Sequence, residues 1–192
     1  VECFRLGMAA EEPLYVVAIG AITNIASALL LEPRLVERLV VVWLGGNPLY
    51  WPPAREFNLQ QDLHASRLVF DCGVPLVHIP CQAVAALLQT TVPEVTAYLA
   101  GRGAIGNYLA RIFAEHSREH YAWSKVVWDI ATIGYLLDPE WVPTQLVHSP
   151  LLTDQLTYSV DAGRHFIRVA TTVYRDPIFR DLFRKVEGHA RS

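Results

Sequence analysis

The sequence carries little charge and no basic stretch. Of its 192 residues only 18% are charged while 52% are hydrophobic, and the formal net charge of −3 corresponds to a pI of about 6.2. The arginines are scattered rather than grouped, so the basic surface that nucleic-acid-binding proteins need is missing. The high hydrophobic fraction argues against disorder and predicts one sizeable buried core. We therefore expect a folded protein without a nucleic-acid partner.

Cysteine is scarce as well. Cys3, Cys72 and Cys81 form neither a CxxC motif nor a Cys/His ligand pattern. An odd number of cysteines fits reduced thiols better than a disulfide framework, which predicts a cytoplasmic protein. His116 and His120 lie four residues apart in a predicted helix, but no third ligand is near them in the sequence. We interpret them as surface residues rather than as a zinc site.

Long hydrophobic runs are absent too. The most apolar stretch, residues 15–33, is interrupted by Gly20 and by Thr23-Asn24, and no signal-peptide pattern opens the sequence, so we expect no membrane partner. Neither a GxSxG nor a P-loop element occurs, which argues against α/β-hydrolases and NTP-dependent enzymes. The sequence opens without an initiator Met and reaches its first predicted strand almost at once. This start suggests a fragment.

Strands and helices alternate over the first 80 residues. Short β-branched runs predict strands that are buried on both faces of a parallel sheet. Segments with helical spacing, an Asp cap or a Gly or Pro stop predict helices between them. The expected strands are 14–20, 38–46 and 74–80, and the expected helices are 23–33 and 62–73.

The remaining residues predict further helices and then further strands. No repeat or linker divides the chain, so we expect a single α/β domain over residues 1–192. Its expected form is an open, mostly parallel sheet with flanking helices and a helical region over the edge where ligands bind. The expected helices are 83–88, 92–101, 104–121, 128–137 and 176–188, and the expected strands are 144–150, 156–161 and 165–174.

The loop GGNPLYWPPAREFN (residues 45–58) is the densest polar and aromatic segment. Its glycines allow close approach of a ligand to the backbone, and Asn47, Glu56 and Asn58 offer the amides and carboxylate that bind vicinal hydroxyls. That chemistry suits a sugar. A rigid crossover loop whose polar groups satisfy its own backbone is the alternative, and the residues alone leave both open.

Two shorter segments, GAITN and WDIA, also allow either a structural role or a binding role. Thr23 in GAITN could sit in a helix N-cap or help to bind a hard cation. In WDIA, one alternative is that Asp129 caps its helix and Trp128 lies in a core or an interface. The other is that Asp129 binds a metal and a flat ligand stacks on the indole of Trp128. Proximity in sequence does not decide between these roles.

Taken in order, AIGAITNIASAL, WLGGN, EFNLQQDLHASRLVF, GVPLVHIP and VVWDIATIGYLLDPEW resemble the later part of the inosine-uridine preferring nucleoside hydrolase family, from about Tyr15 to Phe183. The resemblance implies a Ca²⁺-dependent enzyme on an open α/β sheet that hydrolyses ribonucleosides to ribose and free base. It implies Ca²⁺ ligation by the carbonyl of Thr23 and the carboxylate of Asp129. It also implies catalytic roles for Trp128 and Asn47, and substrate binding by Asn47, Glu56, Phe57, Asn58 and Trp128.

Two features depart from the family pattern. Trp128 stands where many members have His, which is similar to the purine-specific branch and implies stacking on a purine base. The aspartate-rich DxDxxxDD motif that begins family members is missing, and no aspartate precedes Asp62. We therefore expect the chain to carry only part of the active site, as a portion of an active enzyme or as an inactive relative.

Two hypotheses outside catalysis remain, namely a nucleoside- or ribose-binding module and a subunit used only for assembly. An open sheet with an uncovered edge predicts a homo-oligomer or completion by a missing N-terminal segment.

Overall fold

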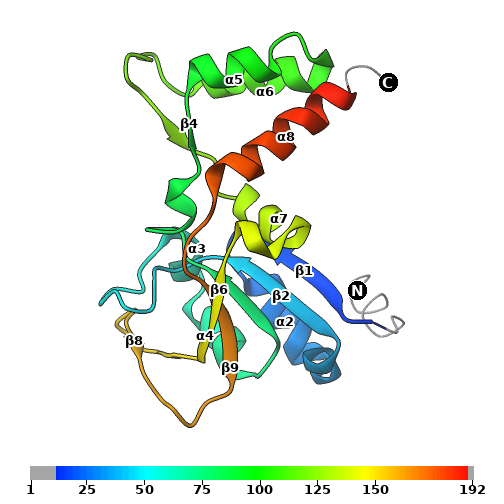
Figure 1. The fold of residues 1–192 in the computed structure, drawn as a ribbon. Coiled ribbons are helices and arrows are strands. Elements are labelled where there is room, and N and C mark those ends of the chain that lie inside the picture. Colours follow the sequence, from blue (N-terminus) through cyan, green and yellow to red (C-terminus); the bar gives the residue numbers. More distant parts are fainter. Residues whose placement is uncertain (1–11, 190–192) are drawn as a thin grey trace.

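A five-stranded sheet forms the centre of the computed structural model, which describes residues 12–189 (Figure 1). The strand order is β1-β2-β3-β9-β6, in which the first four strands run parallel and β6 pairs antiparallel with β9. This confirms the predicted open, mostly parallel sheet. The strands are β1 (Leu14–Ala18), β2 (Leu39–Leu44), β3 (Leu76–Ile79), β9 (Phe166–Ala170) and β6 (Thr144–His148).

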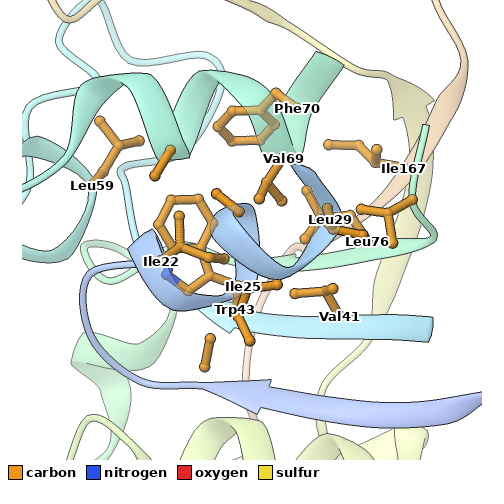
Figure 2. Close-up of a cluster of buried hydrophobic side chains, with 14 of the residues drawn as sticks. Ile22, Ile25, Leu29, Val41, Trp43, Leu59, Val69, Phe70, Leu76 and Ile167 are labelled. Atoms are coloured by element: carbon orange, nitrogen blue, oxygen red, sulfur yellow. The ribbon is translucent and has the colours of Figure 1, made fainter. Parts of the chain in front are cut away.

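Strand β2 lies inside the sheet and is buried on both faces. Its side chains alternate, so that Val41 and Trp43 enter one hydrophobic core while Val42 and Leu44 enter the other. Figure 2 shows the first core, where the rings of Trp43 and Phe70 have centroids 6.0 Å apart. The continuous apolar run of this strand is needed because it fills two cores at once.

Helices cover both faces of the sheet. Helices pack on the core of Trp43 and on the opposite core, to which Val95 and Leu99 also belong. The helix predicted at 62–73 begins as expected, because the carboxylate of Asp62 accepts a hydrogen bond from the Ala65 N–H at 3.0 Å. These helices include α2 (Thr23–Leu31) and α4 (Leu63–Asp71) on the first face, and α7 (Ile130–Leu137) and α8 (Arg175–His189) on the second.

The helical region expected over the ligand edge divides into two parts. Helix α7 packs against β1 and β2, whereas α5 (Val92–Leu99), α6 (Gly103–Glu115) and the end of α8 project together beyond the sheet, at the top of Figure 1. The short strands β4 (Gln89–Thr90) and β5 (Lys125–Val126) pair antiparallel at the base of this projection. No helix within residues 12–189 is both long and apolar enough to cross a membrane.

Several predicted elements are shorter than expected. The helix predicted to reach Tyr121 ends at Glu115, because Nε2 of His120 lies 2.9 Å from the carbonyl oxygens of Ala114 and Ser117 and folds the chain back over the helix end. The predicted helix at 83–88 is the 3₁₀ turn η2 (Ala85–Leu87). The predicted strand at 156–161 is the two-residue β8 (Tyr158–Ser159), which pairs with β7 (Leu151–Leu152). The other short elements are η1 (Pro33–Glu37), α3 (Phe57–Gln60) and η3 (Pro139–Trp141).

Candidate active site

Polar loops meet at the carboxyl edge of the parallel strands, where ligands bind in sheets of this kind. A cavity of about 370 Å³ lies there. The loop after β2 supplies most of its wall, and the segments after β3 and before α7 supply the rest. The cavity therefore brings together all five residues that were predicted to bind substrate. Its lining consists of Leu44, Asn47, Arg55, Glu56, Phe57, Asn58, Cys81, Gln82 and Trp128.

Glu56 is fixed by the backbone around it. It caps α3, and its Oε2 accepts hydrogen bonds from the N–H groups of Gly46 (2.7 Å), Asn58 (3.0 Å) and Leu59 (3.2 Å). A carboxylate is stabilised in this position because the helix N-terminus presents free N–H groups. Oε1 takes no part in these three bonds, which leaves it for a further donor such as the neighbouring Cys81 thiol or a ligand hydroxyl.

Two buried amides hold the same loop. Nδ2 of Asn47 donates to the carbonyls of Pro53 (3.0 Å) and Arg55 (3.1 Å), and Nδ2 of Asn58 donates to the carbonyl of Leu44 (2.9 Å). Oδ1 of Asn47 is buried and has no hydrogen-bond partner within residues 12–189. An acceptor left in this state costs about 1–3 kcal/mol unless water or a ligand donates to it. The donors of these amides thus order the loop, while the buried Oδ1 of Asn47 lacks a donor among the described residues.

Trp128 lies between two cavities of different character. One is the polar cavity described above, and the other, of about 580 Å³, is lined mainly by apolar side chains of α5, α6 and α8. Phe57 lines the polar cavity, with 71% of its surface exposed. The site therefore has a polar side and an apolar side that share one indole ring.

Asp129 also lines the apolar cavity and stands at the start of α7. It occupies the N-cap position, yet its carboxylate makes no capping hydrogen bond, and the Thr132 hydroxyl donates instead to its carbonyl at 2.7 Å. The residue as a whole is exposed, but partial burial of its carboxyl raises the pKa of Asp129. Helix capping therefore does not account for this aspartate.

Cys81 and Gln82 belong to the cavity but were not predicted. They directly follow β3, so the strand-end rule that indicated the other loops would have found them. Burial, reinforced by the charges of Glu56 and Asp129, raises the pKa of the Cys81 thiol and keeps it protonated.

Thr23 is not part of the cavity lining. It is the exposed first residue of α2, and its hydroxyl donates to Oδ2 of Asp62 at 2.6 Å. In the part of the chain that the structure describes, no three His, Cys, Asp or Glu side chains are grouped to hold a metal. Ca²⁺ takes six to eight oxygen ligands. One carboxylate and one carbonyl do not fit this ion by themselves.

Comparison with known proteins identifies the chain. Residues 2–180 match the family described as inosine-uridine preferring nucleoside hydrolase. The chain belongs to this family. The putative pyrimidine-specific ribonucleoside hydrolase RihB of Shigella boydii serotype 4 (strain Sb227) is 31% identical over 146 residues, covering 72% of this chain and 60% of the relative. The pyrimidine-specific ribonucleoside hydrolase RihB of Escherichia coli O1:K1 / APEC is 30% identical, with 72% of this chain and 46% of the relative covered.

Solved nucleoside hydrolase structures share the fold. The inosine-uridine preferring nucleoside hydrolase from Bacillus anthracis superposes with a TM-score of 0.79 at 16% identity, covering 97% of this chain and 64% of that one. An inosine-guanosine nucleoside hydrolase superposes with a TM-score of 0.79 at 20% identity, covering 97% of this chain and 66% of that one. The chain spans about half the length of the curated relatives it matches, from 46% to 60%.

Proposed function

We propose that this protein hydrolyses the N-glycosidic bond of ribonucleosides to ribose and free base, with a preference for purine nucleosides and a requirement for Ca²⁺. The observation that carries the proposal is the position of Trp128 between a polar cavity and an apolar one. A nucleoside has the same two halves, a ribose rich in hydroxyls and a flat base. Membership of the nucleoside hydrolase family supports the same reaction.

The polar cavity would hold the ribose. Its hydroxyls can donate to Oε1 of Glu56 and to the buried Oδ1 of Asn47, while Asn58 fixes the loop that carries them. Phe57 offers an apolar surface on which the sugar ring can rest. These acceptors lie ready before the ligand arrives, and fixed negative and dipolar groups favour the positive charge that develops on the sugar as the glycosidic bond breaks.

The apolar cavity would receive the base. The indole of Trp128 can stack on a nucleobase, which contributes about 0.5–1.5 kcal/mol beyond area burial and helps to accommodate positive charge on a protonated leaving base. A purine covers more of the indole than a pyrimidine does, which is the reason for the proposed purine preference. The two RihB relatives are named pyrimidine-specific, so uridine is the substrate against which that preference has to be measured.

The Ca²⁺ requirement rests on Asp129, a carboxylate beside the cavity that its helix does not use. We propose that Asp129 and the carbonyl of Thr23 supply part of the ligand set and that further carboxylates come from outside residues 12–189 or from a partner subunit in a homo-oligomer. Such an ion would supply the means to orient and activate a water molecule. The described thiols, Cys72 and Cys81, are free, which supports a cytoplasmic protein.

A second candidate is a nucleoside- or ribose-binding protein without turnover. The incomplete metal ligand set within residues 12–189 favours it. Both candidates use the same cavity, so binding alone does not separate them.

The deciding experiment measures Ca²⁺ binding by isothermal titration with and without inosine, alongside release of ribose from inosine and from uridine. Saturable Ca²⁺ binding with faster ribose release from inosine supports the hydrolase as proposed. Ribose release that is undiminished by a chelator would contradict the Ca²⁺ requirement. Inosine binding without ribose release, unchanged by Ca²⁺, would favour the binding protein.

A further inference from the structure

A second polar cavity, also of about 370 Å³, lies between α5 and α8 in the helices that project beyond the sheet. It shares no lining residue with the polar cavity of the candidate active site, whereas Phe179 and Phe183 line both this cavity and the apolar one. Its arginines line neither of those two cavities, so ligand binding by these arginines does not depend on the proposed hydrolysis.

Positive charge is in excess in this cavity. Arg102, Arg180 and Arg184 line it, and none of their side chains has an ion-pair or hydrogen-bond partner within residues 12–189. A fourth arginine, Arg175, is already paired with two carboxylates of the lining, Glu94 and Asp176. Glu187 is the only other carboxylate among the lining residues. Three arginines therefore face a single further acid.

Arg102 is presented by a turn that two glycines make possible. Gly101 and Gly103 have φ values of +77° and +72°, and the Gly101 N–H donates to Oδ1 of Asn107 at 2.7 Å. Nε of Arg102 is buried and has no acceptor within residues 12–189. A buried N–H donor on a charged group costs free energy when it has no acceptor. Because the glycine turn holds Arg102 in this position, we expect the acceptor to be an anion from outside the chain.

The glycine spacing alone does not identify the ligand. The segment GRGAIG, from Gly101 to Gly106, has the spacing GxGxxG, but it joins helix α5 to helix α6. A dinucleotide-binding turn follows a strand, so that motif is not present here. The unpaired arginines and the cavity that they line are the features that indicate an anionic ligand.

The cavity also has an aromatic surface. The rings of Tyr98 and Phe183 stack with centroids 4.9 Å apart and an interplanar angle of 16°. Guanidinium groups match the geometry of phosphate oxygens with paired N–H donors, whereas a flat aromatic surface suits an apolar ligand body. We propose that this cavity binds a phosphate ester of a small organic molecule. The phosphate lies among Arg102, Arg180 and Arg184, and the organic part lies against Tyr98 and Phe183.

Isothermal titration of the 192-residue chain in low-salt, phosphate-free buffer tests this, with phenyl phosphate and inorganic phosphate as the probes. Phenyl phosphate should bind saturably and more tightly than inorganic phosphate. Arg102→Gln should weaken it about tenfold or more, since a hydrogen bond to a charged group contributes about 1.5–3 kcal/mol. Arg180→Gln/Arg184→Gln, which changes only exposed side chains of α8, should weaken it at least as much.

The control is Arg118→Gln, because Arg118 is exposed and lies outside the cavity. Its binding should equal that of the wild type, and the melting temperature of every variant shows whether it is folded. Equal weakening by Arg118→Gln would mean unspecific attraction of anions and would overturn the proposal. So would the absence of saturable binding at millimolar phenyl phosphate, or binding of polyglutamate in its place. Inorganic phosphate binding as tightly as phenyl phosphate would overturn the role of the aromatic surface.

Discussion

The backbone N–H of Gly46 donates a 2.7 Å hydrogen bond to Oε2 of Glu56, and this bond joins the first turn of the β2 loop to its last. Gly46 has a φ of +69°, which residues with a side chain rarely adopt. A Cβ at this position would also collide with the Tyr158 hydroxyl and with Leu59. The orientation of the candidate ribose-binding carboxylate therefore depends on a glycine ten residues earlier.

Gly46→Ala should lower the free energy of unfolding by about 2–4 kcal/mol, because the left-handed backbone and the collision both oppose a side chain. Gly73→Ala is the matched control, since Gly73 has a φ of +82° but nothing within 4 Å of an added Cβ. It should cost only the backbone part, about 1–2 kcal/mol. Urea unfolding measures both variants, and equal losses would show that the collision at position 46 is relieved.

The sheet and most of the candidate site could be predicted from the sequence because local patterns determine them. Val41 to Leu44 form an apolar run that only a strand buried on both faces would bury fully. Asn47, Glu56 and Asn58 follow that strand, so the rule that ligands bind at the carboxyl ends of parallel strands placed them at one edge. The same rule, applied to β3, would have included Cys81.

Contacts between distant residues explain what could not be predicted. The hydroxyl of Thr23 is bonded to Asp62, which lies 39 residues away, and no local pattern reports such a pair. The helix predicted to Tyr121 ends early because His120 turns back onto the carbonyl of Ala114, and helical spacing gives no sign of that bond. The projection of α5 and α6 beyond the sheet likewise follows from packing between helices rather than from the pattern of either one.

His78 should make stability depend on pH. It is fully buried in β3 with Nε2 2.6 Å from the carbonyl of Gly45, and burial lowers its pKa from 6.5 to about 4. Between pH 6.5 and pH 4 the unfolded chain binds a proton that the folded chain does not, so this contribution to the free energy of unfolding is complete above pH 6.5 and is lost as pH falls. The loss should reach about 2–3 kcal/mol by pH 4.5.

The measurement is the free energy of unfolding from pH 7.5 to pH 4.5 for the wild type and for His78→Gln. Subtracting one from the other cancels the contributions of the other titrating groups. The difference between the two proteins should shrink as pH falls. His64→Gln, at an exposed position, is the control for the loss of an imidazole. A constant difference for His78→Gln would mean that the His78 imidazole has the same pKa in the folded and unfolded protein, which would contradict the effect of burial.

Asp129→Asn should separate stability from metal binding. Partial burial raises the pKa of this carboxyl, which means that its ionised form is disfavoured in the fold, and no capping bond is lost with it. The melting temperature without Ca²⁺ should stay the same or rise, while the increase in melting temperature on adding Ca²⁺ should disappear. Asp181→Asn on α8, whose carboxylate bonds Lys185, should keep the Ca²⁺ response. A normal Ca²⁺ response in Asp129→Asn would remove this residue from the proposed ligand set.

Trp128→Ala should lower kcat on inosine by about tenfold or more, which corresponds to about 1.4 kcal/mol of lost stabilisation of the departing base. Trp128→Phe should retain part of the rate because a smaller ring still stacks, and the loss on uridine should be smaller than on inosine because a pyrimidine covers less of the indole. Trp123→Phe is the control, since Trp123 packs on Phe113, with ring centroids 5.5 Å apart, and lines neither cavity. Its kcat should stay at the wild-type value. Equal losses on inosine and uridine would mean that Trp128 acts by positioning its neighbour Asp129 rather than by stacking on the base, and the purine preference would lose its physical basis.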